Sequence, residues 1–162
     1  MGASQTALYH QLRDEFETAL TLYGEAEELY FQSPLNRDQC RIGKARCQLA
    51  LGRSTRAEYH HLVEEMKQRY PSHRSLLREL ELTEVWLHSH MDSRAETIRL
   101  STELLEKEVR HFERAKLLQF RAKAHLSIDA TTDAARDLNE VLHFVPQSYL
   151  AEEAQKVLST IE

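Results

Sequence analysis

The chain has 162 residues, 41% of them hydrophobic and 29% charged, which fits one domain of ordinary size or one short repeat array. Its net charge of −5 at pH 7 argues against nucleic acid as the main partner, because phosphate binding relies on a basic surface. Four glycines and three prolines are too few for the many tight turns of an all-β protein.

Apolar positions at helical spacing predict an all-α chain of nine helices. The expected ranges, in chain order, are 4–12, 15–32, 36–51, 54–70, 73–89, 92–109, 112–128, 131–144 and 148–161. Three prolines are expected to stop helices, since proline cannot continue one: Pro34, Pro71 and Pro146. Four side chains that can cap a helix start are Ser54, Ser72, Asp92 and Ser148.

Small residues recur at a spacing of 38 or 39 residues. One series is Ala19, Ala57, Ala95 and Ala134, and a second, twelve residues earlier, is Ala7, Ala45, Thr83 and Ala122. Two small residues in fixed phase predict where the two helices of a hairpin approach most closely. The same phase predicts breaks near residues 13 and 110, where no local residue stops a helix, so continuous helices over 4–32 and 92–128 remain open.

With Ala115 as position 1 of the fourth unit, Ala122 falls at position 8, Ala134 at 20, Leu138 at 24 and Pro146 at 32. This pattern resembles the tetratricopeptide repeat (TPR) family, although the spacing is longer than 34 residues and the third unit carries Thr83 and no proline. The resemblance implies a right-handed α-α superhelix, a solenoid of antiparallel helix pairs in a single domain of residues 1–162. Its units are expected at 1–34, 35–71, 72–110 and 111–146, with a capping helix in 147–162.

The last helix carries an apolar stripe made of Tyr149, Leu150, Ala154, Val157, Leu158 and Ile161. We expect this stripe to cap the array, because each repeat buries its apolar side only on its neighbours. A docking helix for another chain is the alternative. In the third unit, Trp86 is expected to lie in the core with Leu82 and Val85.

The sequence predicts no catalytic residue, metal site or cofactor. Nine histidines are present, but none stands three or four residues from another, the spacing that puts two ligands on one helix face. Cys40 and Cys47 are expected to be buried free thiols, which suits a reducing compartment. Because no apolar run is long enough for a membrane span, we expect an intracellular, cytoplasmic protein.

The family resemblance implies that a partner lies along the concave face, formed by the first helix of each unit. Inward positions would be Gln39, Ile42, Arg46 and Leu49; Leu77, Leu80, Glu84 and Leu87; and Lys116, Gln119, Lys123 and Leu126. The leucines of the third unit would supply binding energy, and Arg46 and Lys123 would orient an acidic amphipathic helix. We therefore hypothesise a non-catalytic protein-binding scaffold or adaptor. The alternative is a structural or self-assembly segment of a larger helical-repeat protein, including a homo-oligomer.

Residues 27–34 read EELYFQSP, and the first seven match E-x-x-Y-x-Q-S, the pattern cut by a viral cysteine protease that is used to remove purification tags. Ala19 and Ala45 keep the repeat phase on either side, so we expect the segment to belong to the fold. The helix over 15–32 should run through it to Gln32–Ser33, with Pro34 as its stop. A helical segment cannot easily become the extended strand that a protease binds, and the match is expected to be a coincidence.

Overall fold

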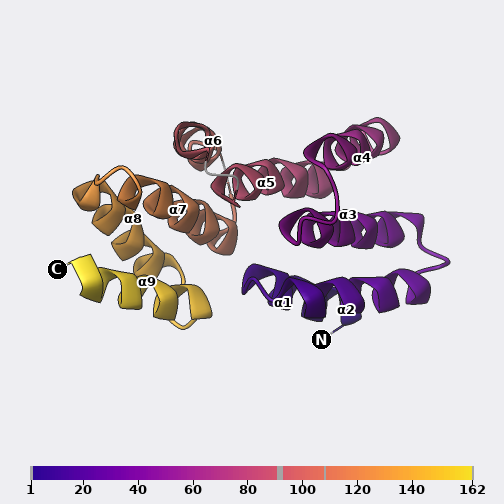
Figure 1. Cartoon of the computed structure of the whole chain (residues 1–162), viewed down its shortest axis with the longest axis horizontal. Helices are drawn as coiled ribbons and strands as arrows, with labels where there is room; N and C mark the ends of the chain where they lie inside the picture. The colour runs from indigo at the N-terminus through magenta and orange to yellow at the C-terminus, as the bar shows by residue number, and fades with distance from the viewer. Residues whose placement is uncertain (1, 91–92, 108, 162) are drawn as a thin grey trace. The chain divides into compact units, whose positions relative to one another are not determined.

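The computed structural model describes residues 2–90, 93–107 and 109–161. Within these ranges the chain forms helices and short connections and no strand, which confirms the predicted all-α class (Figure 1). The helices are α1 (Ala3–Leu12), α2 (Phe16–Leu29), α3 (Pro34–Ala50), α4 (Arg56–Arg69), α5 (Arg74–His90), α6 (Arg94–Leu105), α7 (His111–Leu126), α8 (Thr131–Phe144) and α9 (Tyr149–Ile161).

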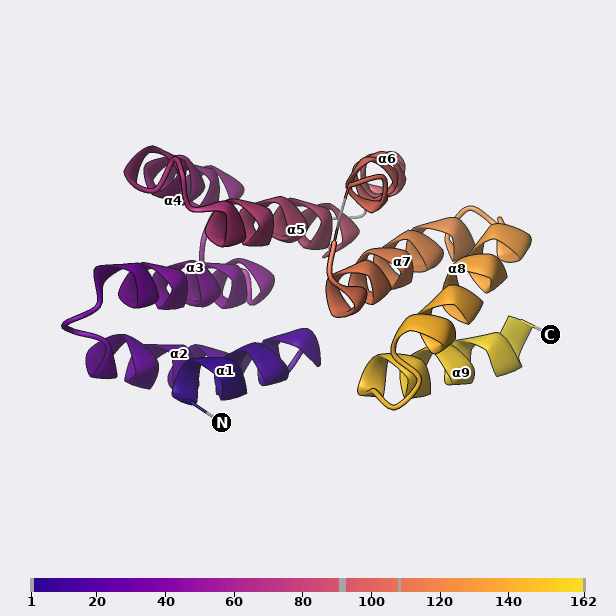
Figure 2. The ribbon, with the colours of Figure 1, turned by 180° about the vertical axis from the view of Figure 1, so that it is seen from behind.

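The helices divide into two compact units, Met1–Leu77 and Arg78–Glu162, and the boundary falls within α5. In unit 1, α2 packs against both α1 and α3, and α3 also contacts α4. In unit 2, α7 contacts α6, α8 and α9. Figure 2 shows α2 and α3 side by side in one unit and α8 and α9 side by side in the other.

The two junctions that the sequence left open are breaks between helices. α1 ends at Leu12 before α2 begins at Phe16, and α6 ends at Leu105 before α7 begins at His111. The repeat spacing therefore located both breaks, although no proline or glycine stands at either one.

Two helix starts differ from the prediction. Pro34 is the first residue of α3 and does not stop α2, because its fixed φ and missing N–H suit the first turn of a helix. The cap of α4 is Thr55 instead of Ser54. The Thr55 hydroxyl accepts a hydrogen bond of 3.2 Å from the amide of Glu58, and the Glu58 carboxylate accepts one of 2.7 Å from the amide of Thr55. The predicted cap at Asp92 lies outside the described residues.

Of the other two predicted caps, Ser148 is confirmed and Ser72 is wrong. Ser148 caps α9, since its hydroxyl accepts a hydrogen bond of 3.2 Å from the amide of Ala151. At the start of α5 the amide of Leu76 donates to the ring nitrogen Nδ1 of His73 at 3.2 Å, so His73 serves as the cap in place of Ser72.

Left-handed residues close the turns between paired helices. Asp14, Gly52 and Asp129 have φ values of 61°, 69° and 60°. The amide after each of them donates to a carbonyl five residues back, which is the Schellman motif. In the described part of the chain this bond occurs in four turns: Glu15 to His10 (3.0 Å), Arg53 to Gln48 (2.8 Å), Ser93 to His88 (3.1 Å) and Ala130 to His125 (2.9 Å). The same backbone hydrogen bond thus occurs at the turn inside each predicted unit.

Five of the eight residues in the two small-residue series are buried, and Thr83 is one of them. Ala7, Ala19, Ala122 and Ala134 are all buried, at the contacts between α1 and α2 and between α7 and α8. Ala57 and Ala95 are exposed, so the prediction that they mark close helix contacts is wrong. The second helix of each pair instead buries a triplet at i, i+4 and i+7. The triplets are Ala19, Tyr23 and Ala26; Tyr59, Val63 and Met66; Thr97, Ser101 and Leu104; and Ala134, Leu138 and Val141.

One aromatic side chain joins α2 to α3. Tyr23 is buried, and its ring lies against Gly43, where an added Cβ atom would come within 2.3 Å of a ring carbon. The Tyr23 hydroxyl donates a hydrogen bond of 3.0 Å to the side-chain oxygen of Gln11 on α1, which is also buried. Tyr23 therefore contacts both neighbours of α2. The buried residues around it are Ala7, Ala19, Ala26, Cys40 and Cys47.

A buried carboxylate joins α3 to α4. The side chain of Asp38 is 5% exposed and accepts hydrogen bonds from Arg41 at 2.9 Å, from Arg69 at 2.7 Å and from the hydroxyl of Tyr70 at 2.8 Å. Burial acts to raise the pKa of this carboxyl. The hydrogen bonds from Tyr70, Arg69 and Arg41 outweigh that effect and hold the pKa of Asp38 below its ordinary value. The fold therefore stabilises the charged form.

Unit 2 is built around α7. Arg121 on this helix donates to both carboxylate oxygens of Asp137 on α8, at 2.8 and 2.7 Å, and to the hydroxyl of Thr102 on α6 at 3.1 Å. One guanidinium therefore connects three helices with the bidentate geometry that suits a carboxylate. An apolar cluster also joins α6 to α7. It contains Leu104 of α6 and Leu117 of α7, together with Val85 of α5.

The apolar stripe predicted for the last helix is confirmed. Leu150, Ala154 and Leu158 of α9 lie in a buried cluster with residues of α7 and α8, and Tyr149, Val157 and Ile161 pack against it. Trp86 is also buried, as predicted.

Both cysteines are free and buried, as the sequence predicted. Burial raises the pKa of the Cys47 thiol to about 11, so this thiol is protonated at neutral pH.

The helix α2 ends earlier than the sequence predicted. Its last residue is Leu29, residues 30–32 form a turn, and Ser33 is the residue before α3. The side chains of Leu29 and Phe31 are 71% and 67% exposed. The prediction that this helix continues to Gln32–Ser33 is therefore wrong, and half of the EELYFQSP segment is a surface connection.

We predict that Gly43→Ala lowers the free energy of unfolding by about 1–3 kcal/mol, because the new methyl group collides with the Tyr23 ring. Gly24→Ala is the matched control: no atom lies within 4 Å of an added Cβ there, and alanine favours the helix by about 0.5–1 kcal/mol. Urea unfolding followed by circular dichroism measures both. Equal effects of the two substitutions would contradict the Tyr23–Gly43 contact.

We predict that Asp38→Asn lowers the free energy of unfolding by about 2 kcal/mol at pH 7, because charge-assisted hydrogen bonds from three donors are weakened. The pKa of Asp38 is lowered by folding, so the advantage of the wild type is present above the ordinary Asp pKa of about 3.9 and is lost as the pH falls through the lower folded-state value.

Urea titrations at pH 7 and pH 3 measure this difference. The matched control is Asp133→Asn, which removes an exposed ion pair with Arg136 and should cost less than about 0.5 kcal/mol. A deficit of Asp38→Asn that is the same at both pH values would show that the carboxylate charge is not what stabilises the contact.

Candidate functional site

The residues predicted to contact a partner are divided between the two units. Those in unit 1 are Gln39, Ile42, Arg46 and Leu77. Those in unit 2 come from α5 and α7 and are Leu80, Glu84, Leu87, Lys116, Gln119 and Lys123.

Burial separates these residues into distinct groups. Buried ones are Ile42, Arg46, Leu80, Leu87 and Lys116, and half-buried ones are Gln39, Leu77, Glu84 and Gln119. Among these ten positions, all of which the structure describes, Lys123 alone is exposed. Leu80 and Leu87 were expected to supply binding energy, but each is 1% exposed. A partner would reach them only after the helices had moved apart.

Three of the predicted residues share one side of α7. Lys116, Gln119 and Lys123 follow Phe112 at intervals of four, three and four residues, which places all four on the same helix face. Phe112 is 41% exposed, and its ring centroid lies 6.3 Å from that of Tyr149 at the start of α9. We call the surface formed by Phe112, Lys116, Gln119, Lys123, Tyr149 and Glu153 the α7–α9 face.

Lys116 lies at the centre of the α7–α9 face. Its side chain reaches between two aromatic rings, with Nζ 5.4 Å from the ring centroid of Phe120 and 5.5 Å from that of Tyr149. Nζ also donates a hydrogen bond of 3.4 Å to the side-chain oxygen of Gln119. Cation–π attraction and this hydrogen bond offset the cost of burying a charged side chain, since the Lys116 residue is 9% exposed.

A hydrogen bond joins the two helices of the α7–α9 face. The amide nitrogen of Gln119 donates to the carboxylate of Glu153 on α9 at 2.6 Å. Glu153 is thereby engaged within the protein, whereas Lys123, one turn beyond Gln119, is exposed. The face consequently presents an exposed aromatic ring at one end and an exposed positive charge at the other.

The sequence predicted only the α7 part of this face. Phe112 lies one turn before Lys116, and the helical spacing of the two could have added it to the set. Tyr149 was assigned to an apolar stripe, and Glu153 was not among the residues predicted to contact a partner. Their position beside α7 depends on how α9 packs, for which the sequence carries no local signal.

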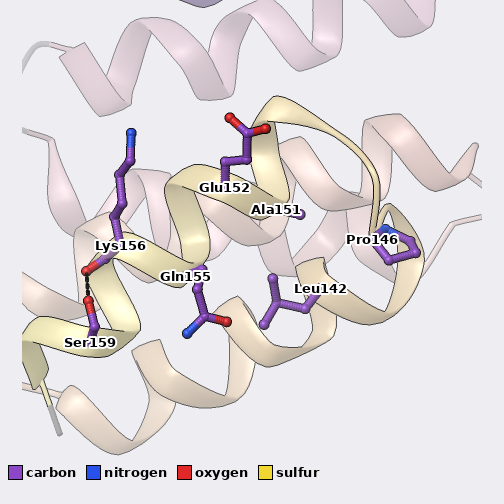
Figure 3. A pocket seen from close by; sticks show the side chains of 7 residues that line it. All are labelled: Leu142, Pro146, Ala151, Glu152, Gln155, Lys156 and Ser159. Carbon is purple, nitrogen blue, oxygen red and sulfur yellow. Dashed lines mark hydrogen bonds between the residues drawn. The ribbon is translucent and has the colours of Figure 1, made fainter.

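A second surface feature is a hollow between α8 and α9 (Figure 3). It has a volume of about 520 Å³ and is lined by Leu142, Pro146, Ala151, Glu152, Gln155, Lys156 and Ser159. Figure 3 shows Leu142 and Gln155 in the space between the helices, while Glu152 and Lys156 extend away from it. The charged groups do not converge on a common point, so the hollow lacks the arrangement of polar groups that fixes a small ligand.

The described residues contain neither a group of metal ligands nor a helix suited to spanning a membrane. Across residues 2–90, 93–107 and 109–161, no three His, Cys, Asp or Glu side chains are grouped so that they could hold a metal ion. Over the same ranges, no helix combines the length and the apolar character needed to cross a membrane.

No protein-family model, curated protein or solved structure matches this chain. The resemblance to TPR proteins, which rests on the repeat spacing, therefore stays a prediction.

Proposed function

We propose that this chain is a non-catalytic, TPR-like scaffold that binds an amphipathic helix of a partner protein on the α7–α9 face. The composition of that face supports the proposal. An exposed aromatic ring, Phe112, and an exposed cation, Lys123, lie on one side of a single helix. An apolar anchor with a charge at one end is the combination by which a groove binds an amphipathic helix in a fixed direction.

Charge complementarity favours an acidic partner helix. The carboxylate of Glu153 already accepts from Gln119, so the exposed charge of the face is that of Lys123. An acidic side chain of the partner placed near Lys123 would increase the association rate and fix the orientation of the helix, while contact with Phe112 would contribute apolar burial.

The proposal includes the superhelical arrangement of the helix pairs and a cytoplasmic location. A hydrogen bond from an amide to the carbonyl five residues back, present inside each of the four predicted units, supports the repeat interpretation. Two buried free thiols support a reducing compartment, because disulfides are rare there.

We predict that Lys123→Glu weakens binding of acidic helical peptides by about tenfold, since reversal of a charge at the rim turns attraction into repulsion. A library of helical peptides selected on the wild-type chain supplies the probes, and fluorescence anisotropy of the labelled peptides gives the dissociation constants. The substitution should leave the circular dichroism spectrum unchanged, because Lys123 is exposed.

Lys67→Glu is the matched control, because it makes the same charge change at an exposed position of α4, a helix that contributes no residue to this face. It should leave peptide affinity within about twofold of the wild type. Selection of no peptide, or equal weakening by the two substitutions, would exclude the α7–α9 face as the binding surface.

Self-assembly is the alternative function, and one observation favours it. Leu8 and Tyr9 of α1 are 40% and 39% exposed, and adjacent exposed apolar side chains often belong to an interface. For an interaction scaffold we predict a monomer in size-exclusion chromatography with light scattering at micromolar concentrations. A dimer that dissociates on Leu8→Glu would instead favour the assembly role.

A further inference from the structure

Residues 27–33 carry the seven letters EELYFQS, which match a protease recognition pattern. The pattern E-x-x-Y-x-Q-S is cut between Gln and Ser by a viral cysteine protease that binds its substrate as an extended strand. Each specified position is present: Glu27 at the first, Tyr30 at the fourth, Gln32 at the sixth and Ser33 at the seventh.

The structure places the scissile end of this segment outside any helix. α2 ends at Leu29, and the chain passes through a turn at residues 30–32 before α3 begins after Ser33. Leu29 and Phe31 are 71% and 67% exposed, and Gln32 is exposed as well. Exposed connections between helices are the preferred places for proteolytic cuts.

Backbone bonds at the end of α2 and contacts with α1 and α3 would have to break before the segment became extended. The amide of Tyr30 donates to the carbonyl of Ala26 at 3.0 Å, and the amide of Ser33 donates to the carbonyl of Tyr30 at 2.9 Å. Glu27 accepts from Lys44 at 2.8 Å, in an ion pair whose side chains are 23% and 34% exposed. The ion pair joins α2 to α3, the hydroxyl of Tyr30 lies 3.2 Å from that of Ser4 on α1, and the half-buried Tyr30 ring packs against the cluster around Tyr23. The backbone bonds lie at the end of α2 and in the turn after it, and helix ends open with a smaller free-energy cost than helix centres.

We propose that the Gln32–Ser33 peptide bond is a cleavage site for a cysteine protease of this specificity. The protease thiolate attacks the carbonyl carbon of Gln32, the bond to the nitrogen of Ser33 breaks, and that nitrogen leaves as an amine with a proton. One water molecule then releases Gln32 as a carboxylate and restores the thiol. The products are residues 1–32 and residues 33–162.

The test incubates the full chain with the purified protease under native conditions, and intact-mass spectrometry identifies the products. We expect two fragments divided after Gln32, formed more slowly than from a free peptide of sequence EELYFQS. Gln32→Ala should abolish cleavage. An intact chain after complete digestion of the free peptide, or cleavage that persists in Gln32→Ala, would overturn the proposal.

Glu28→Gly tests whether opening of the last turn of α2 limits the rate. Position 28 is unspecified in the recognition pattern and exposed in the structure, so the substitution affects mainly the helix. Glycine there should speed cleavage about fivefold, because it weakens the helical turn. The matched control is Glu25→Gly, an exposed position one turn earlier in α2, outside the pattern, which should speed cleavage less. Equal rates for the wild type and Glu28→Gly would overturn the role assigned to that turn.

Discussion

Every short connection in a chain of paired helices must end one helix, leave few carbonyls without partners and redirect the backbone within a few residues. In the turns at residues 14, 52 and 129 a left-handed residue meets that constraint, followed by an amide that donates five residues back. Gly52 adopts this conformation without a steric cost, whereas Asp14 and Asp129 are among the few other residue types that tolerate it. The contacts between paired helices follow from these turns, since the turns set which faces meet.

Much of the fold could be predicted from the sequence, and the failures have physical causes. The nine helices of the described residues, and the breaks near residues 13 and 110, followed from spacing. Ala57 and Ala95 did not lie at helix contacts, because α4 and α6 bury triplets that begin two residues later, at Tyr59 and Thr97. A spacing rule counts residues, whereas packing depends on side-chain size and on the rotation of each helix about its axis.

The candidate site was predictable to the extent that it lies on one helix. Lys116, Gln119 and Lys123 came from the repeat register, and the structure puts them on one side of α7. Tyr149 and Glu153 complete that face from α9, and a contact between residues some thirty positions apart leaves no mark in local sequence patterns. Leu80 and Leu87 were predicted to contact a partner, but both lie in the core. An apolar residue at an inward position of a helix can equally well belong to the core.

The close fit of Tyr23 against Gly43 has a consequence for how the first two helices are held. α1 and α2 are bound to α3 much as a ligand is bound to its receptor, and residues 30–33 act as the tether. A tether this short keeps the effective concentration of the hairpin at its binding surface in the millimolar range or above. The contacts between the α1–α2 hairpin and α3 therefore need only modest intrinsic affinity. The four-residue connection keeps the hairpin close to α3, so that it binds again after each dissociation.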